Sequence, residues 1–274
     1  MPNFTYHTID PPIELAHYVR CFWFFEGKNL DGAPYVYRSM ADASAEMVFH
    51  YKARWQGISE MNEELAGTDK LAILQSPTGT YNRFITREDF GIFGVYLYPY
   101  AITELFRLSS SELQNQMPSI SDCLGNDGRI LQEKMLLAKN NQERVATLSL
   151  FLIKRCRAYA EPASPIQACV KHIIHSSVQA PISKTAALFC ISARQLERQF
   201  KTITGFAPKP FSRISRFQQA LHHYGSGFKS LTEIAYDCGY YDQSHFIHDF
   251  KKFSGYEPRR YFSGKAEGIE YRQD

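Results

Sequence analysis

The feature that most constrains the fold is an internal repeat in the last third of the chain. Residue types recur 50 positions apart, so that a segment near residue 200 matches a second segment near residue 250. The identical or similar pairs are Leu196 and Phe246, Phe200 and Phe250, Lys201 and Lys251, Gly205 and Gly255, Phe206 and Tyr256, Pro208 and Pro258, and Phe211 and Tyr261. Self-similarity at a fixed offset indicates a duplicated supersecondary unit. We therefore expect two copies of one small helical structure.

The first copy has the pattern of two helices joined by a tight turn. Residues 182–189 form a short amphipathic segment in which Ala186 is small enough for a second helix to cross closely. After a turn at Cys190 and Ile191, Ser192 is placed to cap a helix that runs to residue 204. This is the pattern of a helix-turn-helix, whose second helix enters the major groove of DNA.

The second copy repeats this pattern with a turn that is one residue longer. Ser230 is placed to cap residues 231–238, Ala235 takes the small position, and Gly239 provides the turn. Asp242 or Tyr241 opens the second helix, which ends at residue 254. The repeat therefore predicts two recognition helices, about 192–204 and 242–254.

The side chains predicted to face outward on these helices have the chemistry of DNA contacts. Arginine pairs with guanine and glutamine with adenine at base edges, whereas lysine and hydroxyl groups also contact phosphates. The residues predicted to face bases are Arg194, Glu197, Arg198, Gln243, Ser244 and His248. The residues predicted to contact phosphates are Ser192, Lys201, Arg213, Arg216, Lys251 and Lys252. The alternative for any single residue is a solvated helix face, but for the repeated pair it requires several coincidences.

The segment between the copies and the charge of this region agree with a DNA partner. Residues 211–224 are predicted to form one connecting helix, which would hold the recognition helices about 34 Å apart on one face of DNA. Lysine and arginine exceed acidic residues by 13 to 7 over residues 160–262, against 16 to 18 over residues 1–159. A localised positive surface is expected for a polyanionic partner.

These motifs resemble the DNA-binding domain of the AraC/XylS family over residues 181–262. The resemblance is strongest at residues 235–246, AYDCGYYDQSHF, and at residues 250–261, FKKFSGYEPRRY. It implies that Arg194, Arg198, Gln243, Ser244 and His248 stand where the family commonly contacts bases. Two departures are Cys190, where the first turn often has glycine, and Pro210, which is expected just before the connecting helix.

The rest of the chain is predicted to form a separate sensor or dimerisation domain. Short aromatic and β-branched runs over residues 12–98 predict a small antiparallel β-barrel, cupin-like structure or sandwich, and residues 99–159 have helical periods. Pro162 and Pro165 mark a linker. We expect an α+β chain with a sensor domain over residues 1–160, an all-α DNA-binding domain over 166–262 and a tail over 263–274. The apolar stripe of residues 141–159 favours a homodimer.

The N-terminal half also resembles, less specifically, the strand-rich sensor domains that precede this module in AraC-like regulators. The likeness is clearest at residues 93–101, FGVYLYPYA, which resemble the junction between barrel and helices in an uncharacterised subgroup. Such domains bind an effector or mediate dimerisation. The candidate pocket residues are Trp23, Tyr37, Glu46, Phe49 and Tyr96, and the alternative for the aromatic ones is that they form the core of the domain. Glu46 and His50 share one strand face, where they would line a pocket or form a satisfied polar pair at the barrel rim.

No motif for catalysis, a cofactor or a metal is found. The chain has no G-x-S-x-G, P-loop or G-x-G-x-x-G motif, the predicted strands offer His50 alone as an imidazole ligand, and the cysteines are scattered. No apolar run approaches the roughly 18 residues of a membrane span, and the first residues do not form a signal peptide. We expect a cytoplasmic protein that is not an enzyme and does not enter a membrane.

The sequence therefore predicts a bacterial, sequence-specific DNA-binding regulator, an activator, with double-stranded DNA, a small-molecule effector and RNA polymerase as candidate partners. The alternative is a small-molecule-binding or enzymatic barrel whose helical module binds DNA without sequence preference.

Overall fold

The computed structural model describes residues 3–28, 33–61, 63–65, 70–159, 162–176, 180–223 and 230–264. Its first part is rich in strands, and a short 3-10 helix, η1, spans Ile13–Leu15. The strands are β1 (Asn3–Ile9), β2 (Val19–Lys28), β3 (Tyr35–Ser39), β4 (Ala45–Lys52), β5 (Gln56–Ile58), β6 (Ala72–Gln75), β7 (Asn82–Thr86) and β8 (Phe90–Leu97). Of these, β1 lies outside residues 12–98, over which the sequence predicts strands.

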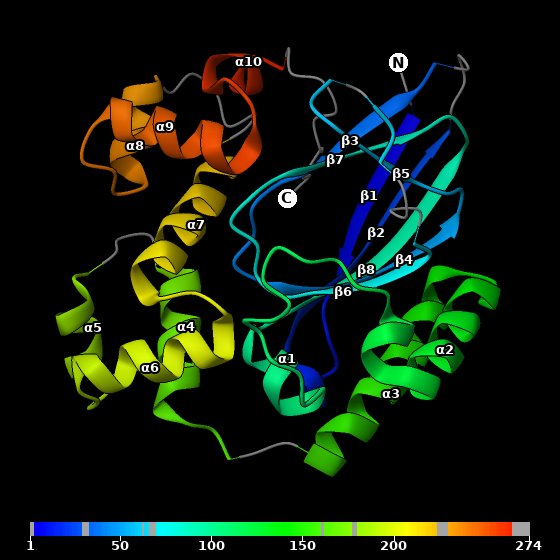
Figure 1. Cartoon of the computed structure of the whole chain (residues 1–274), viewed down its shortest axis with the longest axis horizontal. Coiled ribbons are helices and arrows are strands. Elements are labelled where there is room, and N and C mark those ends of the chain that lie inside the picture. The colour runs from blue at the N-terminus through cyan, green and yellow to red at the C-terminus, as the bar shows by residue number, and fades with distance from the viewer. Residues whose placement is uncertain are drawn as a thin grey trace.

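Within the described residues the strands form two antiparallel sheets. The larger sheet has the order β1-β2-β8-β4-β6 and the smaller has the order β3-β7-β5 (Figure 1). The strands therefore divide between two sheets, as in the predicted sandwich, and the predicted alternative of a closed barrel is wrong. The mixed α+β fold class is confirmed.

The larger sheet is covered on both faces. Phe22 and Phe49 belong to the apolar cluster shared with the helices, whereas their neighbours Trp23 and Val48 belong to a second cluster shared with the smaller sheet. Successive side chains of a strand point to opposite faces, so a strand buried on both sides needs a nearly continuous apolar run. The aromatic runs of β2, β4 and β8 meet this need.

Three helices follow the sheets in the chain. They are α1 (Tyr100–Leu105), α2 (Ile120–Leu137) and α3 (Asn141–Tyr159). The helix predicted at 141–159 is confirmed as α3, with Leu148 and Leu152 fully buried. Its inner face packs against α1, α2 and η1 of the same chain. The apolar stripe that favoured a dimer thus has a partner within the monomer.

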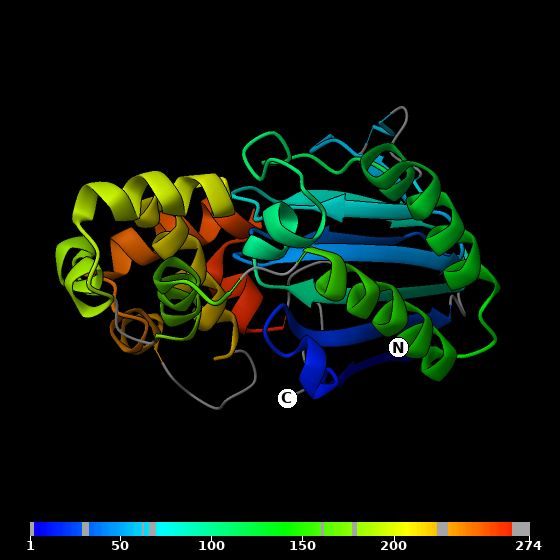
Figure 2. The same cartoon turned by 90° about the horizontal axis from the view of Figure 1, so that it is seen from below.

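The C-terminal part is entirely helical where it is described. Its helices are α4 (Pro165–His175), α5 (Ile182–Leu188), α6 (Ala193–Thr204), α7 (Pro208–Leu221), α8 (Leu231–Asp237), α9 (Gln243–Ser254) and α10 (Pro258–Phe262). They gather on one side of the sheets, away from α2 and α3 (Figures 1 and 2). One apolar cluster includes Leu105 of α1 and Leu196 of α6, so the two parts of the chain pack against each other. No described helix is both long and apolar enough to span a bilayer.

Candidate nucleic-acid interface and cavity

The first unit consists of α5, a turn and α6. Ser192 is the N-cap of α6, and its side chain accepts a hydrogen bond from the backbone N–H of Gln195 at 3.2 Å. Ala186 is buried on α5, and its carbonyl accepts a hydrogen bond from the N–H of Ile191 at 3.1 Å. Cys190 turns the chain with a positive φ of 55°. The first unit thus has the small residue, the turn and the cap that the sequence predicts.

The second unit consists of α8, a turn and α9, and it repeats the bonds of the first. Asp242 is the N-cap of α9 and accepts a hydrogen bond from the N–H of His245 at 2.7 Å. The carbonyl of the buried Ala235 accepts from the N–H of Tyr240 at 2.9 Å, which is the counterpart of the Ile191 bond. Gly239 has the positive φ, 71°, that Cys190 has in the first unit.

The longer second turn is confirmed. Tyr241 is the additional residue between the positive-φ position and the N-cap, and 87% of it is exposed. The repeat also extends to packing between rings. The ring centroids of Phe200 and Phe211 lie 5.1 Å apart in the first unit, and those of Phe250 and Tyr261 lie 5.2 Å apart in the second. The chain therefore contains two copies of one packed unit.

The two second helices bury one face and expose the other. The inward face of α6 buries Leu196 and Phe200, and that of α9 buries Phe246, Phe250 and Phe253. The exposed residues on α6 include Arg194, Glu197, Arg198 and Lys201, and those on α9 include Ser244, His248, Lys251 and Lys252. Gln243 is half-buried at the start of α9, where its side-chain oxygen accepts a hydrogen bond from the Thr232 hydroxyl at 3.3 Å.

Two of the predicted phosphate contacts have partners inside the domain. Arg213 of α7 pairs with Asp249 of α9, with Nε 3.2 Å from Oδ2 and a second bond from Nη2 to Oδ1. Asp249 is fully buried, and its hydrogen bond raises the pKa of Arg213. Arg216 donates to the carbonyl of Gly239 at 2.9 Å and lies 4.8 Å from the ring centroid of Tyr240. Both arginines thus join the connecting helix to the second unit.

Sequence reasoning missed Asp249. A carboxylate three positions after Phe246 and one before Phe250 stands on the buried face of an amphipathic helix. Such a group needs a cation or several donors. A carboxylate on this buried face therefore indicates that a cation or several donors lie beside it, and Arg213 is such a cation.

The connecting helix differs from its predicted bounds. It begins at Pro208, which takes the first helical position, so Pro210 lies within the first turn rather than before the helix. Proline is tolerated there because first-turn N–H groups have no partner within the helix. The helix ends at Leu221, and the predicted end at Tyr224 lies outside the described residues.

Comparison with known proteins supports the assignment of α5–α6 and α8–α9 as helix-turn-helix units. Residues 185–264 match a family model described as a helix-turn-helix domain, and residues 7–119 match one described as a domain of unknown function (DUF6597). The transcriptional activator RhaS of Klebsiella pneumoniae is 28% identical over 43% of this chain and 44% of its own length. RhaS of Escherichia fergusonii is 33% identical over 30% of each chain. The protein carries an AraC-type helix-turn-helix domain.

The sequence resemblance to the AraC/XylS family is therefore confirmed for the C-terminal part. The chain spans less than half the length of these two relatives. Among solved structures, it is similar to the DNA-binding domain of AdpA in complex with a target DNA, with 25% identity, a TM-score of 0.35, and coverage of 37% of this chain and 93% of that one.

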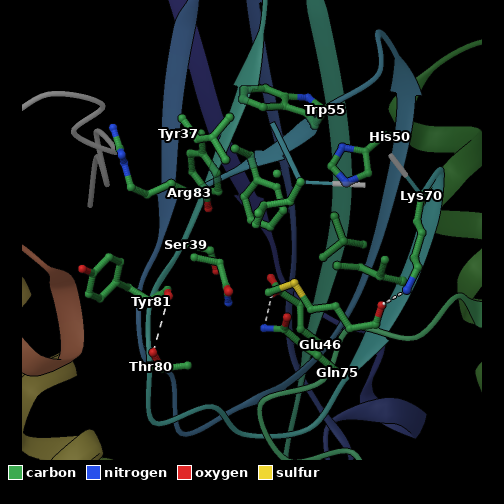
Figure 3. Close-up of a pocket in the computed structure, with 18 of the residues that line it drawn as sticks. Tyr37, Ser39, Glu46, His50, Trp55, Lys70, Gln75, Thr80, Tyr81 and Arg83 are labelled. Atoms are coloured by element: carbon green, nitrogen blue, oxygen red, sulfur yellow. Dashed lines mark hydrogen bonds between the residues drawn. The ribbon is translucent and has the colours of Figure 1, made fainter. Parts of the chain in front are cut away.

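A cavity of about 500 Å³ lies between the two sheets of the N-terminal part. Residues from β2, β4, β6 and β8 line one wall, and residues from β3, β5 and β7 line the other. Figure 3 shows Trp55 and Tyr37 at one end of the cavity and Glu46 and Gln75 at the other. The cavity therefore combines an aromatic end with a polar one.

The cavity contains part of the predicted pocket set. Trp23, Tyr37 and Glu46 line it. Phe49 does not, because it points to the opposite face of β4 and is fully buried against the helical layer. Tyr96 packs beside Trp23, with ring centroids 5.9 Å apart, but lies outside the lining. The prediction is therefore corrected at Phe49 and Tyr96.

The polar groups of the cavity include His50, which the sequence placed on one face with Glu46. Burial lowers the pKa of His50 to about 4, so the ring is neutral at pH 7. Its Nδ1 and the indole N–H groups of Trp23 and Trp55 are buried without a hydrogen-bond partner among the described residues. Gln75 donates to the Glu46 carboxylate at 3.4 Å. Within the described residues, no cluster of three or more metal-ligating side chains is present.

The AraC-type domain contacts the N-terminal part at the C-terminal ends of both recognition helices. The Ser110 hydroxyl donates to the carbonyl of Ile203 at 3.0 Å, near the end of α6. The N–H of Ala41 donates to the carbonyl of Phe253 at 2.9 Å, near the end of α9. Arg38 lies 4.0 Å from the ring centroid of Tyr256 just beyond that end. Each of these three contacts thus lies at or just beyond the C-terminal end of a recognition helix rather than at its N-terminal end.

Proposed function

We propose that the protein is a sequence-specific DNA-binding transcription regulator. The observation that carries the proposal is the duplicated unit, in which α6 and α9 have matching caps, turns and ring packing and expose polar side chains. The match to a helix-turn-helix domain supports it. The named activity of the RhaS relatives, transcriptional activation, agrees with a role as activator.

We propose different contacts for the two helices. Arg194, Arg198 and Glu197 of α6, and Gln243, Ser244 and His248 of α9, face base edges. Ser192, Lys201, Lys251 and Lys252 contact phosphates. Arg213 and Arg216 are assigned instead to holding the second unit on α7, because Arg213 donates to Asp249 and Arg216 donates to the carbonyl of Gly239. Arginine favours guanine and glutamine favours adenine, so the two half-sites differ in base preference.

The N-terminal part, residues 1–160, is proposed as the domain that controls this DNA binding through a ligand in the cavity. Tyr81 lines the cavity, and its ring lies 5.2 Å from the Arg38 guanidinium, which also contacts Tyr256. There is no room for a Cβ atom at Gly255, directly after α9, because the Tyr81 ring lies against it. A ligand that moves Tyr81 would therefore change the contacts at the C-terminal end of α9.

Three further assignments are proposals from the sequence. They are a homodimer, contact with RNA polymerase and a cytoplasmic location. The dimer must use a surface other than the inner stripe of α3, which is packed within the chain. Leu137 and Leu150 are 74% and 70% exposed on the outer sides of α2 and α3.

The proposed function is tested by selecting bound sequences from a random DNA pool with the full-length protein. A regulator enriches one long site with two conserved segments about 34 Å apart. Competition with bulk DNA then measures the preference for the selected site. Recovery of random sequences, or equal competition by bulk DNA, would instead support the non-specific DNA-binding alternative.

A further inference from the structure

An acidic side chain lies at the polar end of the cavity. Glu46 lies there, buried with only 8% of its surface exposed. It stands opposite Gln75 in the pairing of β4 with β6, and the Gln75 amide donates to it. A buried carboxylate favours a positively charged or hydrogen-bond-donating neighbour.

The cationic side chains that line the cavity are bonded elsewhere. The ammonium group of Lys70 donates to the carbonyl of Met117 at 2.8 Å, at the side of the cavity (Figure 3). The guanidinium of Arg83 donates to the carbonyls of Ser59 and Glu60 at 2.9 and 3.3 Å. His50 is neutral. An anionic ligand would therefore meet a carboxylate rather than a free positive charge.

The walls are aromatic. Trp23 lies across Gly94 of β8, where a Cβ atom would collide with its indole ring, so the missing side chain makes room for the ring on the cavity floor. Trp55 packs edge-on to Tyr37, with ring centroids 5.8 Å apart. The faces of tryptophan and tyrosine attract cations, most strongly where water is excluded. The indole N–H groups of both tryptophans have no hydrogen-bond partner within the described part of the chain, and they add donors that favour an acceptor.

We propose that the cavity binds a small organic cation that also carries a hydrogen-bond acceptor. Glu46 supplies the counter-charge, and Trp23, Trp55 and Tyr37 supply the walls. An acceptor on the ligand receives a hydrogen bond from an indole N–H. This inference gives the proposed effector its chemical class, and it rests on the proposal that the cavity is the effector site.

The two tryptophans of the chain, Trp23 and Trp55, both line the cavity, so intrinsic tryptophan fluorescence reports directly on its occupancy. The probes are acetylcholine, its uncharged carbon isostere 3,3-dimethylbutyl acetate, and hexanoate. We expect a saturable change with acetylcholine, binding about tenfold weaker for the isostere, and none for hexanoate. Equal affinity for the isostere, or tighter binding of hexanoate, would overturn the inference.

Substitutions that keep the side chain close to its original size test which residue provides the charge that binds the cation. Glu46→Gln keeps the shape and an oxygen for Gln75, and should weaken acetylcholine about tenfold while leaving the isostere unchanged. As the control, Lys52→Gln changes an exposed lysine that pairs with Asp89 and does not line the cavity, and it should alter neither affinity. Loss of binding in Lys70→Gln, with Glu46→Gln unaffected, would assign the site to an anion. An unchanged affinity for acetylcholine in Glu46→Gln would also refute the inference. Selection of a DNA site by the ligand-free protein tests the proposed function separately, because it does not depend on the probe.

Discussion

The two helix-turn-helix units have the same backbone plan but are held in different ways. In the first unit, the contact of α6 with α7 is apolar, through Phe200 and Phe211. In the second, α9 contacts α7 through the ring of Phe217 and also through the pair of Arg213 with the buried Asp249. The residue 50 positions before Asp249 is Gln199, which has no charge. Duplication has thus kept the helix geometry while the attachment to the connecting helix diverged.

The exposed faces diverged as well. The outward face of α6 is dominated by charged groups, including Arg194, Arg198 and Glu197, whereas α9 begins with Gln243 and Ser244. The longer turn of the second unit adds the exposed Tyr241 directly before the N-cap. Two copies with one backbone can therefore contact different bases, which a long asymmetric DNA site requires.

The largest expected effect comes from removing the charge that holds the second unit. Arg213→Met removes the guanidinium from the buried Asp249 and leaves only the rings of His245 and His248, each 3.6 Å from the carboxylate, among its described charge partners. The change should lower the free energy of unfolding by about 3 kcal/mol. Denaturant unfolding of the full-length protein, followed by circular dichroism, measures this loss. The change should also weaken DNA binding, because the orientation of α9 is lost.

A double variant separates this effect from general damage. Adding Asp249→Asn to Arg213→Met removes the unpaired charge and should recover part of the lost stability. The matched change in the first unit, Gln199→Met, should shift stability by less than about 0.5 kcal/mol. A loss in the single Arg213 variant no greater than that of Gln199→Met would show that the ion pair does not distinguish the units.

The second largest effect is expected on sequence-specific DNA binding. Arg198→Ala and Gln243→Ala should each weaken binding to the selected site by about 1–3 kcal/mol and binding to random DNA much less. Each loss should fall on a different half of the site, since the residues lie on different helices. Titration with half-site mutants of the DNA measures this, and Arg157→Ala, an exposed arginine on α3, is the control. Equal losses on specific and random DNA would make both residues phosphate contacts.

Much of this domain could be predicted from the sequence because its signals are local. Caps at Ser192, Ser230 and Asp242 and left-handed glycines at 205 and 255 depend on a few neighbouring residues, and the repeat shows each signal twice. The pair of Arg213 with Asp249 could not be placed in this way, since it joins positions 36 residues apart. The charges of Arg213 and Arg216 gave no indication that their partners lie within the domain.

The cavity was harder to predict for the same reason. Trp23, Tyr37 and Glu46 could be named from the apolar runs, but Phe49 was also named as a pocket residue because a strand buried on both sides lacks polar alternation. Much of one wall comes from β5 and β7, short strands without a strong apolar pattern. Trp55 stands just before β5, and its role depends on how two sheets meet.

A smaller effect is expected at the turns. Gly239 and Cys190 occupy matching positions with φ of 71° and 55°, a region that strains residues with a Cβ atom. Gly239→Ala should lower the free energy of unfolding by about 1 kcal/mol, and Cys190→Gly should raise it by about 0.5 kcal/mol. Thermal unfolding of both variants measures the difference. Destabilisation by Cys190→Gly would indicate that the thiol makes a packing contribution larger than the strain.

The smallest effect concerns two lysines at matching positions of the repeat. Lys251 lies 2.6 Å from the carboxylate of Glu257, whereas the counterpart of Glu257 in the first unit is Ala207, which offers Lys201 no such partner. Lys201→Gln should reduce the slope of log Kd against log salt by about one, because one fewer counterion is released when a phosphate is bound. Lys251→Gln should reduce it by less, since Lys251 must first leave Glu257. Glu257→Gln should remove this difference and increase the salt dependence of binding. If Lys251→Gln reduced the slope as much as Lys201→Gln in the presence of Glu257, the surface ion pair would have no influence on the phosphate contact, and the two units would be equivalent at this position.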